Sequence, residues 1–143
     1  MPRTSSGWHT SGNRPRILLD RCISPRLAPV LRLAQIHCVT LADVYGDDEA
    51  QKTPDTQWIA DSAKYGYAVF TTNPNILKVK HEVEALRQHG AKVFCIAKPD
   101  GTRETRAYIY GRHILNILRR MKRPGPCFWR LYHGQRPVSY DIN

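Results

Sequence analysis

Residues 16–26, RILLDRCISPR, are the stretch from which the fold can be built outward. Ile17, Leu18 and Leu19 form a continuous apolar run, which is typical of a strand buried on both faces of a parallel sheet. Asp20 follows at the carboxyl end of this predicted strand, where open α/β sheets place their functional groups. A carboxylate at this point is either a solvated turn residue or a site residue, and the following segments have to distinguish the two.

Strand-like and helix-like segments alternate after Asp20. The predicted strands are residues 17–19, 37–41, 67–71 and 91–97, and the predicted helices begin at Ser24, at Thr53, before Val83 and at Thr102. Pro25 and Pro54 suit the first positions of the first two helices. Residues 127–142 suggest a closing hairpin or edge strands. This order predicts an α/β fold with a central, mostly parallel sheet that helices flank on both faces.

The chain of 143 residues suits one domain. Residues 1–15 are basic and lack an apolar segment, so we expect a flexible tail before a single domain of residues 16–143. No apolar run is long enough to span a membrane. The four cysteines are widely spaced and lack metal-site spacing, which indicates free thiols in a cytoplasmic protein rather than disulfides.

The formal charge of +10 is unevenly distributed. Residues 17–100 are balanced, whereas residues 101–143 carry nine basic residues against two acids. Such a basic segment suits a polyanionic partner such as nucleic acid, and the alternative is merely a soluble surface.

Polar groups are predicted to converge at the carboxyl edge of the sheet, because parallel strands end there and their helices begin there. This edge would collect Asp20, Asp55, residues 71–75 and an acidic loop that contains Asp43, Asp47, Asp48 and Glu49. Clustered oxygen ligands suit Mg²⁺ or Mn²⁺, which can assist attack on a phosphodiester. Each acid also has a structural interpretation on its own: a turn for Asp20, a helix-dipole partner for Asp55 and a solvated loop for the others.

Four segments resemble a known family, in the same order: LLDRCISPRL at 18–27, TPDTQWIADSAKYGYAVFTTNPNI at 53–76, EALRQHGAKVFCIA at 84–97 and PGPCFWRLY at 124–132. They look like the PIN-like nucleases of VapC type. The resemblance covers about residues 16–132. It implies a PIN-like fold, a Mg²⁺- or Mn²⁺-dependent endoribonuclease, and the toxin of a type II toxin–antitoxin pair that a cognate antitoxin silences. Whether the chain also forms a homodimer stays open.

Carried over by position, the resemblance implies that Asp20 and Asp55 are catalytic and bind the metal. Asp43 matches an intermediate acid, with Asp48 as a competitor. Asn73 stands where the family has an aspartate. An amide can offer one oxygen to a metal, but it adds no negative charge and accepts no proton. Asn73 is therefore a predicted ligand whose identity can weaken catalysis.

The predicted substrate-binding residues are Arg21, Thr71, Thr72, Arg112, Arg119 and Arg120, of which the arginines are chosen by charge and position. A second hypothesis is a non-catalytic PIN-like module that binds RNA or a partner and in which Asn73 marks a lost metal site. A nucleotide-binding flavodoxin-like domain is disfavoured, because Asp20, Arg21 and Cys22 stand where a glycine-rich phosphate loop would follow the first strand.

Overall fold

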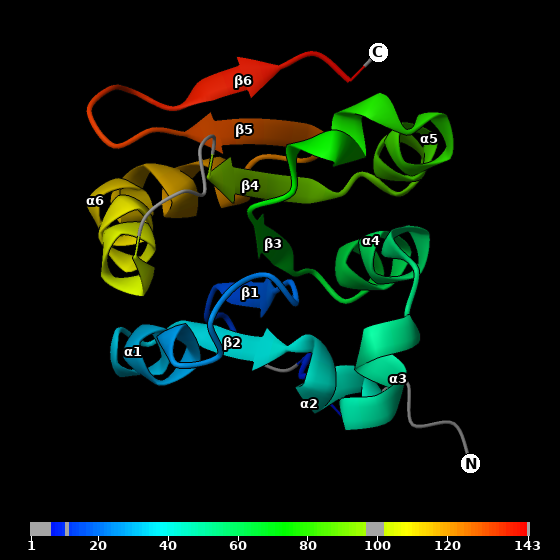
Figure 1. The fold of residues 1–143 in the computed structure, drawn as a ribbon, viewed down its shortest axis with the longest axis horizontal. Helices are drawn as coiled ribbons and strands as arrows, with labels where there is room; N and C mark the ends of the chain where they lie inside the picture. Colours follow the sequence, from blue (N-terminus) through cyan, green and yellow to red (C-terminus); the bar gives the residue numbers. More distant parts are fainter. Residues whose placement is uncertain (1–6, 11, 97–101, 143) are drawn as a thin grey trace.

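A six-stranded sheet forms the centre of the molecule in the computed structural model, which describes residues 7–10, 12–96 and 102–142 (Figure 1). The strand order is β2-β1-β3-β4-β5-β6. The strands are β1 (Arg16–Leu19), β2 (His37–Thr40), β3 (Ala68–Thr71), β4 (Lys92–Ile96), β5 (Cys127–Leu131) and β6 (Val138–Tyr140). β1 to β5 run parallel, and β6 pairs antiparallel with β5. The predicted α/β fold with a closing hairpin is confirmed.

Helices cover both faces of this sheet. They are α1 (Leu27–Leu33), α2 (Leu41–Tyr45), α3 (Asp47–Lys52), α4 (Asp55–Lys64), the 3-10 helix η1 (Pro74–Lys78), α5 (Lys80–His89) and α6 (Arg103–Met121). α1 and α6 lie on one side of the sheet, and α2 to α5 lie on the other (Figure 1). None of the helices in the described residues has the length and apolarity that a bilayer crossing requires.

The two cores follow from the alternation of side chains along each strand. Ile17 and Leu19 of β1 pack toward α1 and α6, whereas Leu18 packs toward α2 to α5. In β3, Phe70 and Val69 divide between the two faces in the same way. The apolar run of β1 is therefore buried on both sides, as a central parallel strand requires.

Three local expectations are wrong. The predicted acidic loop is helical: α2 and α3 occupy it, joined at Gly46, whose φ of 89° suits glycine. Thr53 does not cap α4, because its hydroxyl donates to the carbonyl of Glu49 and Pro54 occupies the N-cap. Ser24 does not cap the first helix, which begins late, at Leu27, in keeping with the later start that Pro29 suggests.

The segment before β1 is packed where the structure describes it. Trp8 is buried and its ring stacks on that of Tyr65, 5.3 Å away between centroids. The Tyr67 hydroxyl accepts a hydrogen bond from the backbone N–H of His9 and donates one to its carbonyl. A boundary at residue 16 thus leaves a core residue outside the domain. All four cysteines are free, as predicted.

Candidate active site

Asp20 is a buried carboxylate at the carboxyl end of β1. Its side chain is only 4% exposed, and its N–H continues the parallel pairing by donating to the carbonyl of Phe70 in β3. One carboxylate oxygen accepts the N–H of Arg21 at 2.7 Å, and the other accepts the hydroxyl of Thr71 at 2.8 Å. This burial excludes the solvated turn as the role of Asp20.

Thr71 joins the ends of β1 and β3. Its hydroxyl donates to Asp20 and accepts the N–H of Asn73 at 3.0 Å. Its carbonyl accepts the buried hydroxyl of Tyr110 from α6 at 2.8 Å. Cys22 lies on the same group: its sulfur is 3.5 Å from both an oxygen of Asp20 and the hydroxyl of Thr71, and it accepts the N–H of Thr72. Asp20 is therefore held in one orientation from several sides.

Asp55 is the first residue of α4, where the helix dipole favours a carboxylate. One of its oxygens accepts the indole N–H of Trp58 at 2.9 Å, and Trp58 is fully buried. The guanidinium of Arg21 donates to the carbonyl of Thr53, two residues before Asp55. Arg21 thus fastens the turn after Asp20 to the segment that enters α4, which is a positioning role.

Glu82, whose sequence position carries no signal of a site, is the third acid of this group. It lies in the first turn of α5, which packs against α4, and its carboxyl shares a hydrogen bond with that of Asp55. Burial, the charge of Asp55 and this hydrogen bond raise the pKa of Glu82 to about 7, with a further contribution from Asp20. Burial also raises the pKa of Asp20, helped by the charge of Asp55 and opposed by the hydrogen bonds from Thr71 and Arg21.

These shifts show that Asp20, Asp55 and Glu82 repel one another as anions, so that the group favours either a proton or a cation. Within the described residues, no three His, Cys, Asp or Glu side chains converge to enclose a metal ion. Mg²⁺ does not need such a cage, because it is commonly held by one or two carboxylates, water and substrate phosphate. The all-oxygen donor set and the accumulated negative charge fit a hydrated hard cation.

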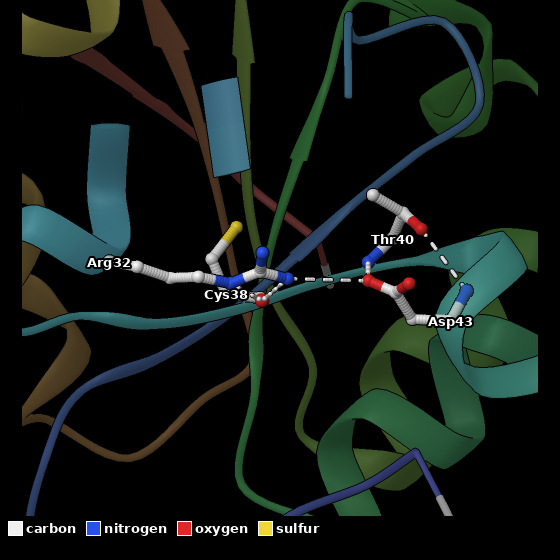
Figure 2. Close-up of polar contacts among 4 residues, drawn as sticks. All are labelled: Arg32, Cys38, Thr40 and Asp43. Atoms are coloured by element: carbon white, nitrogen blue, oxygen red, sulfur yellow. Dashed lines mark hydrogen bonds and ion pairs between the residues drawn. The ribbon is translucent and has the colours of Figure 1, made fainter. Parts of the chain in front are cut away.

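Asp43 has other partners. It forms a capping box at the start of α2, in which its carboxylate accepts the N–H of Thr40 at 2.9 Å and its own N–H donates to the Thr40 hydroxyl. Figure 2 shows this box together with Arg32, whose guanidinium lies 3.5 Å from Asp43 and also donates to the carbonyl of Cys38. Asp43 is not among the charges that shift the pKa of Asp20 or Glu82. The contacts of Asp43 are thus those of a helix cap and an ion pair with Arg32.

The competing acids of that stretch, Asp47, Asp48 and Glu49, occupy the first turn of α3 and are exposed. At the end of β3, Asn73 lies beside Thr71, but its side-chain oxygen accepts the N–H of Asn75 and caps η1. The predicted ligand oxygen of Asn73 is thus engaged in a local turn.

The predicted substrate-binding arginines do not lie together. Arg21 lies at the carboxyl edge beside Asp20, with Thr71 and Thr72. α6 starts at this edge, after β4, and leads back to the opposite edge, where β5 begins parallel to β4. Arg119 and Arg120 are in its last turn and therefore lie toward the opposite edge, while Arg112 donates to the carbonyl of His133.

The parallel sheet with carboxylates at its carboxyl edge has the architecture expected of a PIN-like domain, and the comparison with known families shows that class. The family model described as a PIN like domain matches residues 15–98, a range that contains Asp20, Asp55 and Glu82. The chain belongs to this family. It is 30% identical over 117 residues to a Mycobacterium tuberculosis protein named "Putative ribonuclease VapC45", which covers 81% of this chain and 85% of that protein. No solved structure matches the chain.

Proposed function

We propose that this chain is a Mg²⁺- or Mn²⁺-dependent endoribonuclease and the toxin of a type II, VapBC-like toxin–antitoxin pair. The observation that carries the proposal is the group of Asp20, Asp55 and Glu82 at the carboxyl edge of the sheet, where burial, together with the charge of Asp55, raises the pKa of Asp20 and of Glu82. The relative's name, a ribonuclease of VapC type, supports RNA as the substrate and an antitoxin as the partner.

Asp20 and Asp55 would hold the metal, with Glu82 as the third charge of the site. When bound, Mg²⁺ or Mn²⁺ supplies an activated water and neutralises charge on the phosphodiester. Thr71 and the Arg21 N–H orient Asp20 through the bonds that they donate to its two oxygens. With a pKa of about 7, Glu82 is only partly ionised near neutral pH, and a bound cation would favour its ionised form.

Glu82 also bears on whether the site can be catalytic with Asn73 in place of an aspartate. Asn73 brings no charge to the edge, and its oxygen caps η1. Glu82 provides a carboxylate from a different helix, so the site retains three acids without an aspartate at position 73. The proposal is therefore an active enzyme.

The test is cleavage of labelled structured and single-stranded RNA with Mn²⁺, with Mg²⁺ and with EDTA. We expect Asp20→Asn, Asp55→Asn and Glu82→Gln each to reduce cleavage by about 100-fold, on the scale of losing one preorganised charged group. Asp48→Asn, which removes an exposed acid from α3, is the matched control. Wild-type cleavage that EDTA leaves unchanged, or equal losses in Asp48→Asn, would contradict the proposal.

A non-catalytic RNA- or partner-binding module is the second candidate function. The position of Asn73 favours this function, because its side-chain oxygen, the predicted metal ligand, already accepts a hydrogen bond from the N–H of Asn75 in the η1 cap. Calorimetric titration with Mn²⁺ separates the two functions. Binding of RNA without any binding of Mn²⁺, together with inactivity of Asn73→Asp, would establish the module and exclude the nuclease.

A further inference from the structure

A polar hollow lies on the α6 side of the sheet, away from Asp20. It has a volume of about 430 Å³ and is bounded by the second half of α6, by β4 and β5 and by the segment that leads into β6. The polar residues around it are Asn116, Arg119, Arg120, Trp129 and Arg136. We call this hollow the arginine pocket.

The arginine pocket carries three positive charges and no acid among its lining residues. Arg119 donates to the side-chain oxygen of Asn116 at 3.3 Å, and the Arg120 guanidinium lies 4.6 Å from the centre of the Trp129 ring. Neither contact neutralises a charge. Within the described part of the chain, none of these three arginines forms an ion pair. Three uncompensated guanidiniums around one hollow repel one another, and an anion removes that repulsion.

The side chains favour a nucleotide unit as the occupant. Guanidinium groups bind phosphate oxygens in a bidentate manner, which makes arginine suited to phosphate recognition. The Arg120 guanidinium lies over the Trp129 ring, and both groups are of the kinds on which nucleobases stack in single-stranded complexes. An acidic protein segment would use the charges but not these stacking groups.

The pocket cannot share a contact with the scissile phosphate. β5 is three strands away from β1 in the sheet, a separation of about 14 Å at the usual strand spacing. An RNA strand must therefore extend over several nucleotides to reach both places. The pocket would therefore act on the flanking part of a substrate.

We propose that the arginine pocket binds a phosphate and its base in the RNA substrate, outside the point of cleavage. The inference rests on the proposed function, which makes RNA the substrate. It predicts that affinity increases with RNA length once the strand reaches the pocket, and that part of the salt dependence of binding comes from Arg119 and Arg136.

The experiment measures binding by fluorescence anisotropy in EDTA, so that cleavage plays no part. Labelled single-stranded RNAs of increasing length are titrated with the wild-type chain and with the double variant Arg119→Ala/Arg136→Ala. The matched control is Lys52→Ala/Lys64→Ala, which removes two exposed positive charges from α3 and α4 on the other face of the sheet. Circular dichroism checks that each variant is folded.

We expect the arginine variant to lose about tenfold in affinity for the long RNAs and much less for the shortest. Its slope of log K against log salt should fall by about 0.7, as for one lost phosphate contact on a single strand. Equal losses in the lysine variant, a loss independent of RNA length, or no loss would overturn the inference. So would binding of poly-glutamate, but not RNA, that depends on Arg119 and Arg136. RNA binding through the pocket in a chain that never cleaves RNA would support the inference and contradict the ribonuclease.

Discussion

The proton on Glu82 links the site to the stability of the metal-free protein. Because the pKa of Glu82 is raised to about 7 in the folded state from 4.5, the folded chain binds more protons than the unfolded chain between these pH values. Stability that comes from this group is present below pH 4.5 and is lost as the pH rises through about 7. The raised pKa of Asp20 acts in the same direction.

We therefore expect this site to make the wild-type protein in EDTA more resistant to urea at pH 5 than at pH 8. The free energy of unfolding of Glu82→Gln should change less between these two pH values. With allowance for its partial exposure to solvent, the difference attributable to Glu82 is on the order of 1 kcal/mol. Equilibrium urea unfolding at the two pH values measures it. Added Mn²⁺ should restore the wild-type stability at pH 8. An identical pH dependence in wild type and Glu82→Gln would refute this account.

Thr71 provides a second prediction at the scale of one residue. Its hydroxyl donates to buried Asp20 at 2.8 Å, so Thr71→Val leaves a carboxylate oxygen without that donor. We expect a loss of about 1–3 kcal/mol in the free energy of unfolding, together with reduced cleavage. Thr71→Ser retains the hydroxyl and should restore most of both. Urea unfolding and RNA cleavage of the two variants give the answer, and a serine variant as impaired as the valine variant would show that the methyl group matters instead.

Among the elements, the central strands could be predicted and two features of the site could not. The apolar run at Ile17 to Leu19 predicted β1 because burial on both faces leaves no place for polar residues. The start of α2 carries a local signal as well, because Thr40 and Asp43 have the spacing of a capping box, but the acidic composition of the stretch led to the wrong prediction of a loop. Glu82 had no local signal. It reaches Asp55 only because α5 packs against α4, a contact between helices that no spacing within either sequence reveals.

The capping box of α2 yields a prediction that separates structure from catalysis. Asp43→Ala removes the acceptor for the Thr40 N–H and the ion pair with Arg32, so we expect a loss of about 1 kcal/mol in the free energy of unfolding. Cleavage per folded molecule should stay at the wild-type level, in contrast to Asp55→Asn. Chemical unfolding and the RNA assay on both variants test this. A 100-fold loss of cleavage in Asp43→Ala would return this acid to the catalytic group.

Across the whole molecule, the two kinds of charge occupy different places. The acids gather at the carboxyl edge near β1 and β3, whereas the arginine pocket lies beyond α6 near β5. Under the proposed function, an RNA strand drawn to the basic side would have one part near the acids and another in the arginine pocket. The separation explains how a chain with a formal charge of +10 can present an anionic site to a polyanion.

The segment before β1 belongs to this architecture, because it binds the α2–α4 layer together. The buried Trp8 ring contacts the rings of Tyr45, which ends α2, of Tyr65, which follows α4, and of Tyr67, which precedes β3. Gly7 lies so close to the backbone of Asp43 that a Cβ there would collide with it. Gly7 and Trp8 are thus in direct contact with α2.

We expect Trp8→Ala to cost about 3–5 kcal/mol, as for other buried tryptophans, and Gly7→Ala to destabilise through the collision with α2. Trp8→Phe keeps an aromatic ring in the same position and should cost clearly less, since the indole N–H has no partner to lose. Arg14→Ala changes an exposed residue of the same segment and is the control. Urea unfolding of the four variants ranks them by their free energy of unfolding. If Trp8→Ala unfolds at the same urea concentration as Arg14→Ala, the segment contributes nothing and the domain begins at β1.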